Sequence, residues 1–407
     1  MKVLLINWIY NSGSTGFIMR DLKNVMSGKG VDVMVASGVV KGGEDKNVFH
    51  YSNKFEWILY YHFLKYFNNR FQGNLFGTKR LIKFIKQENP DIVNIHVINS
   101  WSLDLYKLLH FLSSHDIKTV ISNHAELYYT GACGYAYSCR QFIDNQCKAC
   151  ETPQICSGTR FGMHPSKMWK LMYDSIQSFK KNKLVFTAVS PWVKQRFEMS
   201  PVTKGYPCVV AMNGIETSVF YRRKQTTVSK KGKPCKDYLL FVAANFNPKD
   251  KDDVKGGYYL VELAKLMPNV QFVVVASYFS NVEDIPANII LWGKAANQNE
   301  LATFYSNAKL TVLTSKKETF SMICAESLCC GTPVVGFKAG GPESISMKPY
   351  SCFVEHGDLN GLKETINKFI GLNFDRDNIS KEAMSLYSKE AMTDGYLDVY
   401  RKIMEEK

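Results

Sequence analysis

Apolar and polar residues alternate along the first half of the chain in blocks that predict buried strands separated by helices. Six short apolar runs have the β-branched content of strands: residues 2–8, 31–37, 91–97, 118–124, 184–190 and 208–213. Between them, residues 16–30 and 102–116 carry the three-to-four-residue apolar spacing of amphipathic helices. Apolar strands flanked by helices predict a parallel sheet that is covered on both faces.

The same alternation restarts after a Lys-rich polar stretch, residues 221–236, whose composition is typical of an exposed loop or linker. The strands predicted beyond it are residues 238–246, 270–277, 288–293, 309–315 and 332–337. The helices predicted between and after them are residues 257–267, 297–308, 322–330 and 360–370, followed by an amphipathic tail over 380–406. A second doubly wound α/β domain is therefore expected.

Together these patterns predict the α/β class with two Rossmann-like, doubly wound parallel sheets that face a central cleft. The first domain is expected over residues 1–215, with a Cys-rich insertion at about 130–160 and with a C-terminal helix at about 386–407 packing back on it. The second domain is expected over residues 216–385. Ligands of such sheets bind at the carboxyl ends of the strands, so the cleft is the expected active site.

The amino-acid composition is that of an ordinary globular protein and excludes several other classes of protein. With 407 residues, 45% of them hydrophobic and 22% charged, the chain is neither disordered, collagen-like nor a disulfide miniprotein. No apolar run reaches the roughly 20 residues that a membrane span needs. The opening run, residues 1–8, is too short for the core of a signal peptide, so we expect a cytoplasmic protein.

The net charge of +14 is concentrated in the first half of the chain. Through Cys208 there are 26 Lys and Arg against 14 Asp and Glu, and the remainder has 25 against 23. A basic half favours an anionic partner, and nucleic acid, an acidic membrane surface or a phosphorylated substrate would each fit.

Two carboxylates flank a predicted strand-to-helix turn in the second half. Glu318 lies in the turn after the strand at 309–315, and Glu326 lies eight residues later in the helix that follows. Between them are the free backbone N–H groups of the helix start, and these attract phosphate. A nucleotide diphosphate would rest on the N–H groups of Phe320, Ser321, Met322 and Ile323, with a carboxylate on either side.

This spacing, followed by the Gly331-Thr332-Pro333 turn, resembles the E-x7-E signature of the GT-B retaining glycosyltransferases, particularly glycosyltransferase family 4. The resemblance implies that Glu318 contacts the donor sugar and Glu326 the ribose. Thr319 and Ser321 stand where the family usually has two glycines, and Ile323 stands where it has proline. The alternative is a pair of unrelated surface glutamates beside a core helix.

Further positions match the same family. Lys255 falls on its diphosphate-binding lysine, whereas Asn245 replaces the accompanying arginine, for which Lys249 or Lys251 would compensate. The turn at 340–343 would bring Gly341 close to the donor, and the Gly-rich loop at 12–16 would bring Thr15 and Gly16 close to its diphosphate. Each of these features would also suit an ordinary turn, loop or surface lysine.

His124 ends the strand at 118–124, where the family places a histidine near the donor sugar. The resemblance makes it the third catalytic candidate, with Glu318 and Lys255. Asn123-His124-Ala125-Glu126 has its acidic residue displaced by one position from the usual form. A lone histidine is otherwise most often a structural hydrogen-bonding residue.

Five cysteines crowd the predicted insertion, at positions 133, 139, 147, 150 and 156. The Cys147-x2-Cys150 knuckle with Cys133 and Cys139 supplies four thiolates, enough for a structural zinc ion. Free thiols in a packed insertion are the alternative. The segment resembles an insertion found in family 4 enzymes that build bacterial surface polysaccharides, and no cofactor is implied for the chemistry itself.

Residues 51–86 combine many aromatic residues with seven Lys and Arg, at positions 54, 65, 70, 79, 80, 83 and 86. Such a segment suits the inner face of the cytoplasmic membrane, to which the protein would bind peripherally. Two core helices with solvated lysines are the alternative. No nucleic-acid-binding motif is visible, so nucleic acid is not an expected partner.

The resemblance as a whole implies a retaining hexosyltransferase. It would transfer a sugar from a nucleotide-diphosphate donor to a lipid-linked glycan acceptor in the synthesis of a bacterial surface polysaccharide such as O-antigen, capsule or exopolysaccharide. Three other classes stay open: a phosphorylase or epimerase of the same fold, a nucleotide-sugar-binding protein without catalysis, and a protein that binds polyanions or membranes.

Overall fold

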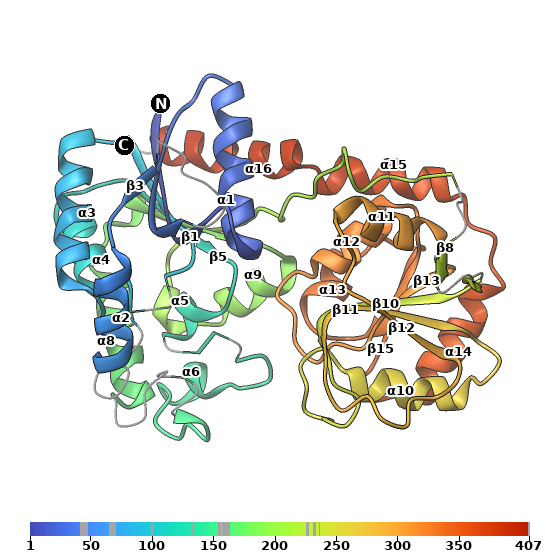
Figure 1. Cartoon of the computed structure of the whole chain (residues 1–407). Coiled ribbons are helices and arrows are strands. Elements are labelled where there is room, and N and C mark those ends of the chain that lie inside the picture. Colours follow the sequence, from blue (N-terminus) through green and yellow to red (C-terminus); the bar gives the residue numbers. More distant parts are fainter. Residues whose placement is uncertain are drawn as a thin grey trace. The chain divides into compact units, whose positions relative to one another are not determined.

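A computed structural model describes the chain except residues 41–47, 65–70, 99–100, 132, 135, 154–155, 157–162, 225–227, 231–232, 236 and 406–407. The chain divides into two compact units (Figure 1). The first comprises residues 1–212 with 392–407, and the second comprises residues 213–391. Each unit is built around one parallel sheet, as the alternation of strands and helices predicts.

The first unit has a seven-stranded sheet in the order β3-β2-β1-β4-β5-β6-β7, with every neighbouring pair parallel. Its strands are β1 (Lys2–Tyr10), β2 (Asp32–Val40), β3 (Val48–His50), β4 (Ile92–Ile95), β5 (Thr119–Asn123), β6 (Leu184–Ala188) and β7 (Cys208–Val210). Its helices are α1 (Gly13–Gly28), α2 (Lys54–Leu64), α3 (Leu75–Glu88), α4 (Leu105–Ser114), α5 (Leu127–Thr130), α6 (Gln141–Asp144), α8 (Pro165–Gln177) and α9 (Pro191–Glu198). Short 3-10 turns precede β6 at Lys181–Lys183 and β7 at Pro201–Thr203.

The helix expected over 386–407 is observed as α16 (Lys389–Glu405). From Met392 onward its apolar side chains share one buried cluster with β1, β2 and α1. Two phenols carry polar contacts into that cluster: Tyr396 Oη donates to Ser122 Oγ at 3.1 Å, and Tyr400 Oη donates to Asn94 Oδ1 at 2.7 Å. The end of the chain therefore completes the core of the first unit.

The second unit has a six-stranded parallel sheet in the order β12-β11-β10-β13-β14-β15. Its strands are β10 (Leu239–Phe246), β11 (Phe272–Phe279), β12 (Ile289–Gly293), β13 (Leu310–Leu313), β14 (Val334–Phe337) and β15 (Ser351–Val354). Its helices are α10 (Gly257–Leu266), α11 (Gln298–Asn307), α12 (Met322–Cys329), α13 (Gly341–Ile345), α14 (Leu359–Ile370) and α15 (Arg376–Tyr387). In both sheets the strand order reverses beside the first strand, which is the doubly wound topology.

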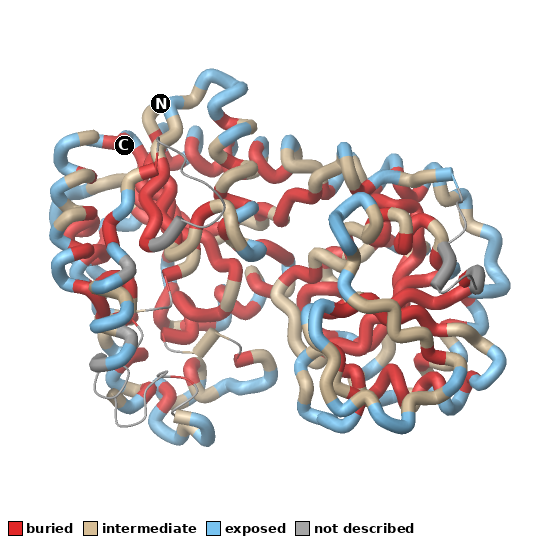
Figure 2. Tube along the Cα trace, in the orientation of Figure 1, coloured by how far each residue is buried: buried red, intermediate tan, exposed pale blue. Residues whose placement is uncertain are grey.

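Buried residues are concentrated on the strands of each sheet and on the helix faces that cover them (Figure 2). The polar stretch 221–236, expected as a loop, contains a short antiparallel hairpin of β8 (Val228–Lys230) and β9 (Lys233–Cys235). Its strands are too short and too polar to show an apolar pattern, which explains the wrong expectation. None of the helices in the described part of the chain is both long enough and apolar enough to span a membrane.

Candidate donor site in the second unit

The two charged side chains expected at the donor site meet in the structure. Lys255 lies in the loop between β10 and α10, and Glu318 lies in the loop between β13 and α12. Lys255 Nζ donates to Glu318 Oε1 at 2.6 Å, with 31% and 16% of the two side chains exposed. A cation and an anion are therefore held together at the carboxyl edge of the sheet, within reach of solvent.

Backbone contacts fix the Glu318 loop from both sides. Glu318 N donates to Ala339 O at 2.9 Å, and Gly341 N donates to Glu318 O at 2.8 Å. A Cβ atom on Gly341 would lie 2.5 Å from the backbone of Thr319 and Phe320, so only glycine allows this approach. Gly341 was predicted to lie close to the donor. In the structure its backbone packs directly against the Glu318 loop.

The backbone of Ser321 has the conformation that suits glycine, the residue that the family resemblance implies at this position. Its backbone has φ 82° and ψ 89°, in the left-handed region that side chains disfavour. Its side chain accepts from Cys324 N at 3.3 Å and so caps α12. Met322 and Ile323 form the first turn of this helix and are half-buried.

Glu326 lies in the second turn of α12, half-buried, and its carboxylate accepts from Tyr305 Oη of α11 at 3.0 Å. Burial raises the pKa of Glu326 to about 7, because the desolvation of its charge outweighs the hydrogen bond from Tyr305. The Glu326 carboxyl, one turn after the start of α12, can therefore accept hydrogen bonds from hydroxyl groups, and it is partly desolvated before any ligand binds.

Two further predicted donor residues have other surroundings. The Phe320 side chain is 3% exposed and packs edge-on against Tyr387, so only its backbone is available to a ligand. Asn245 is half-buried near the end of β10, in register with Tyr278 of β11. Lys249, expected to replace the missing arginine, lies at the surface and pairs with Glu283 at 3.0 Å.

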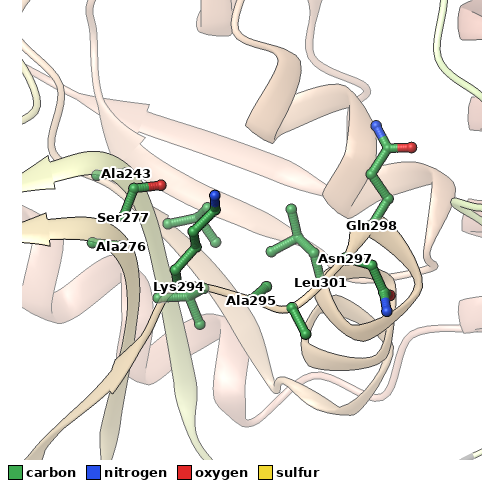
Figure 3. Close-up of a pocket in the computed structure, with 11 residues that line it drawn as sticks. Ala243, Ala276, Ser277, Lys294, Ala295, Asn297, Gln298 and Leu301 are labelled. Atoms are coloured by element: carbon green, nitrogen blue, oxygen red, sulfur yellow. The ribbon is translucent and has the colours of Figure 1, made fainter. Parts of the chain in front are cut away.

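A cavity of about 280 Å³ opens beside this edge, at the ends of β10, β11 and β12 (Figure 3). Small apolar residues of the strands form one side, and the loop after β12 with the start of α11 forms the other. Figure 3 shows the Lys294 side chain extending between Ser277 and Leu301. Because Tyr305 lies on the same helix as Leu301, α11 connects this cavity to Glu326.

Arg376 fixes the turn that ends α12. Its guanidinium donates to Gly331 O at 2.9 Å and to Ala308 O at 2.6 Å, and it also contacts Thr332 Oγ1. Burial, and next the nearby Arg222, lower the pKa of Arg376 to about 10. The Gly-Thr-Pro turn is thus held by a cation from α15.

In the first unit, the expected loop at 12–16 is instead the start of a helix. Ser12 is the extended residue before α1, and Thr15 and Gly16 lie in its first turn. Asn7 Nδ2 donates to Thr15 Oγ1 at 3.4 Å, and Gly16 is buried against Ile9. The sequence suggested a loop because glycine and serine weaken the helical pattern there.

His124 follows β5 and is 8% exposed, and His96, which the sequence analysis did not select, follows the neighbouring strand β4. Their Nε2 and Nδ1 atoms lie 2.9 Å apart. Because parallel strands end at one edge of a sheet, the histidine near the end of each of the predicted strands 91–97 and 118–124 was a usable signal for this pair. The Lys294 loop, Tyr305 and Arg376 were missed as well, since no local motif marks them.

Glu126, the acidic residue displaced by one position after His124, forms a buried ion pair. Glu126 is 1% exposed and accepts from Arg196 Nε at 2.8 Å and from Tyr137 N at 2.7 Å. Arg196 also donates to Cys139 O at 3.3 Å. A buried ion pair therefore anchors the cysteine-rich segment to α9.

In the described part of the chain no disulfide joins the five cysteines of this segment, and their thiols lie near one another. Cys150 Sγ and Cys156 Sγ are 3.6 Å apart. Burial, and next the thiols of Cys139, Cys150 and Cys133, raise the pKa of Cys147 to about 12. Among the described residues, however, no group of three or more His, Cys, Asp or Glu is arranged to hold a metal ion, and zinc stays a prediction.

Residues 16–219 match the family model described as Glycosyltransferase Family 4, and residues 224–385 match the one described as Glycosyl transferases group 1. The N-acetyl-alpha-D-glucosaminyl L-malate synthase of Bacillus anthracis is 26% identical over 239 residues, which cover 56% of this chain. The matched region spans 60% of that relative's length.

Solved structures of low sequence identity share the fold. A glycosyltransferase of Rickettsia africae has a TM-score of 0.64 at 14% identity, covering 100% of this chain and 99% of its own. The HepE protein of Anabaena, solved in complex with UDP-glucose, has a TM-score of 0.61 at 14% identity, covering 98% and 99%. The fold is therefore the two-domain α/β fold of GT-B glycosyltransferases. Since one family model spans half of the chain and the other most of the remainder, the chain belongs to glycosyltransferase family 4.

Proposed function

We propose that this protein transfers a hexose from a nucleotide-diphosphate donor to a hydroxyl of a growing, lipid-linked bacterial surface polysaccharide, with retention of configuration. The observation that carries the proposal is the Lys255–Glu318 pair at the start of α12, with Glu326 one turn behind it. HepE, which shares this fold, was solved in complex with UDP-glucose, and this supports the proposal that the present protein binds a nucleotide sugar.

The described residues of the second unit offer a separate place for each part of such a donor. The nucleobase would enter the cavity beside α11, whose lining is mostly apolar with a few polar groups. The ribose hydroxyls would reach Glu326, and the diphosphate would rest on the N–H groups at the start of α12. The transferred sugar would then lie against Glu318.

Donor binding would break the hydrogen bond between Lys255 and Glu318, and each side chain would form a new contact with the donor. The Lys255 ammonium would turn to the diphosphate, and Glu318 would accept from hydroxyls of the sugar. As the bond from the anomeric carbon to the phosphate oxygen breaks, negative charge grows on the diphosphate, where Lys255 and the helix N–H groups stabilise it. The acceptor oxygen bonds to the anomeric carbon on the same face, and its proton passes to a phosphate oxygen.

The surface of α2 and α3 supports membrane binding. Phe55, Ile58 and Leu59 share one side of α2 and are 76%, 40% and 47% exposed, and Phe76 at the start of α3 is 62% exposed. Exposed lysines at 79, 83 and 86 follow Phe76 along α3. Glu56 of α2 is held by Arg80 of α3, so the acid on this surface is neutralised. Lys65 and Arg70 of the predicted segment lie outside the described residues.

A surface of exposed aromatic and aliphatic side chains next to lysines fits the interface of an anionic lipid bilayer. Replacing Lys79, Lys83 and Lys86 by Glu should weaken co-sedimentation with anionic vesicles at least about tenfold, since each lysine near such a surface contributes ~1 kcal/mol. Replacing Lys265, Lys368 and Lys381 by Glu, three exposed lysines of the second unit, is the matched control. Equal binding by both variants would remove the membrane from the proposal.

The activity is tested by screening nucleotide sugars for binding and for release of the nucleoside diphosphate. Glu318→Gln and Lys255→Ala should lower turnover by about 100-fold or more. Glu262→Gln and Lys265→Ala form the matched control, because that pair on α10 has a similar separation of 2.7 Å. The anomeric configuration of the product, read by NMR, tests retention.

The rival classes predict other results in the same screen. A nucleotide-sugar-binding protein would bind a donor and release nothing, and a phosphorylase or epimerase would release sugar phosphate or return an altered donor. A polyanion-binding protein would bind no donor and would show steep salt dependence with polyanions.

A further inference from the structure

Two half-buried aromatic rings lie together at the carboxyl edge of the first sheet. Trp192 is in the first turn of α9, which follows β6, and Tyr137 lies in the chain between α5 and α6. Their ring centroids are 5.6 Å apart, and the two planes are inclined by 33°. Because β5 and β6 are parallel neighbours, the segments that follow them share the edge at which ligands of doubly wound sheets bind.

A buried ion pair and a strained backbone hold these two rings. Glu126, which follows β5 and is 1% exposed, accepts from Tyr137 N at 2.7 Å and from Arg196 Nε at 2.8 Å. The Arg196 guanidinium lies 5.4 Å from the centre of the Trp192 ring. Tyr137 has φ 42°, in the left-handed region that bulky side chains disfavour. Burying charges and straining a backbone both cost free energy, and here they fix two rings that remain partly exposed to solvent.

The surface near the two rings is polar. Ser138, Arg140 and Gln195, which lie near them in the chain, are exposed. Among the described residues, no large apolar side chain between positions 77 and 198 is exposed. An acyl chain or an apolar protein face would therefore find no further apolar surface beside the rings.

A sugar ring fits such a surface better than a wholly apolar ligand does. One face of a pyranose presents C–H bonds, which carry slight positive charge, and the face of an aromatic ring is negative. The sugar hydroxyls at the rim of the pyranose need polar partners, and the exposed polar side chains near the rings supply them.

We propose that Tyr137 and Trp192 form a carbohydrate-binding platform that takes a sugar ring of the acceptor glycan. This inference rests on the proposed function for the role of the ligand, because that function assigns the donor to the second unit and requires a glycan as acceptor. The binding of a sugar ring itself depends only on the aromatic pair. Glu126 and Arg196 are positioning residues of the platform.

Sugar binding is tested without any donor. Saturation-transfer NMR with the full chain should detect binding of at least one of three probes, cellotriose, maltotriose and chitotriose. Tyr137→Gly and Trp192→Ala should each weaken this binding about tenfold. Glycine suits the left-handed backbone at position 137, so Tyr137→Gly removes the ring without adding strain. Trp192→Phe keeps an aromatic face and should bind nearly as the wild type does.

Tyr173→Ala is the matched control. Tyr173 on α8 is also half-buried, and its ring stacks on Trp169 at 5.3 Å. Its replacement should leave sugar binding unchanged, and Tyr137→Gly and Trp192→Ala should unfold within a few degrees of the wild type. Failure of all three probes to bind, or equal binding by the wild type and Trp192→Ala, would overturn the proposal.

Transfer assays separate this inference from the proposed function. With a donor and an acceptor that are turned over, Trp192→Ala should raise the acceptor KM about tenfold and leave the donor KM unchanged. An unchanged acceptor KM would show that the platform does not take the acceptor. If a probe binds through Trp192 and no donor is turned over, the proposed function fails while the carbohydrate-binding platform stands.

Discussion

Because the carboxyl of Glu326 is half-buried, we expect the stability of the second unit to fall as pH rises. A folded-state pKa of about 7 against an ordinary 4.5 means that the folded protein binds more protons than the unfolded chain between these values. The contribution of Glu326 protonation to the free energy of unfolding is therefore fully present below about pH 4.5, and it is lost as pH rises through about 7. Glu326→Gln cannot ionise, so the variant should avoid this loss.

The gap of about 2.5 pH units between 4.5 and 7 corresponds to about 3 kcal/mol, at ~1.36 kcal/mol per unit. Because Glu326 keeps some exposure to solvent, screening reduces this figure, and we expect a gain of about 1–3 kcal/mol at pH 8. For a unit of this size, that gain raises the unfolding temperature by about 2–10 °C.

The assay is thermal unfolding of the wild type and of Glu326→Gln at intervals from pH 5 to pH 8.5. The difference between the two unfolding temperatures should be smallest at pH 5, should grow with pH and should level off above about pH 7. Glu364→Gln, on the exposed side of α14, is the control and should show no trend. A Glu326→Gln difference that stays constant across the pH range would refute the argument from burial.

Three further predictions concern the structure around the site. Ser321→Ala should destabilise the protein by about 1 kcal/mol in thermal unfolding, because it removes the cap of α12, whereas Ser321→Gly should be nearly neutral, since relief of the left-handed backbone offsets the lost cap. Arg376→Leu should cost about 2–3 kcal/mol in urea unfolding, because it leaves the carbonyls of Ala308 and Gly331 without their donor. Purified protein should retain one zinc ion per chain by metal analysis, and chelation should lower its unfolding temperature; less than one ion with no change in stability would end the structural-zinc prediction.

The sequence predicted most of the framework because apolar periodicity encodes burial directly. The strands of both parallel sheets followed from it except β3 and β15, as did α1, α4, α10, α11, α12 and α14 and the strand-to-helix turn between Glu318 and Glu326. Their chain order, read with the family resemblance, also placed Lys255 in the same site as Glu318. Local pattern and turn chemistry were sufficient for these features.

The remaining features depend on contacts between distant parts of the chain. The His96–His124 pair requires that β4 and β5 be neighbours, and Arg376 reaches the turn at Gly331 from a helix that begins 45 residues later. The start of α1 was missed because Gly13 and Gly16 weaken the helical pattern there, although Ser12 precedes a regular first turn. Such contacts leave no periodic signal in the sequence.

In the proposed function, a nucleotide sugar binds in the second unit with its diphosphate at the start of α12. Crystals of the full chain soaked with the nucleotide sugar that gives the largest thermal shift test it most directly. We expect the base beside Lys294, the ribose hydroxyls at Glu326 and the diphosphate between Lys255 and Ser321. A donor bound elsewhere, with the Lys255–Glu318 contact unchanged, would contradict it.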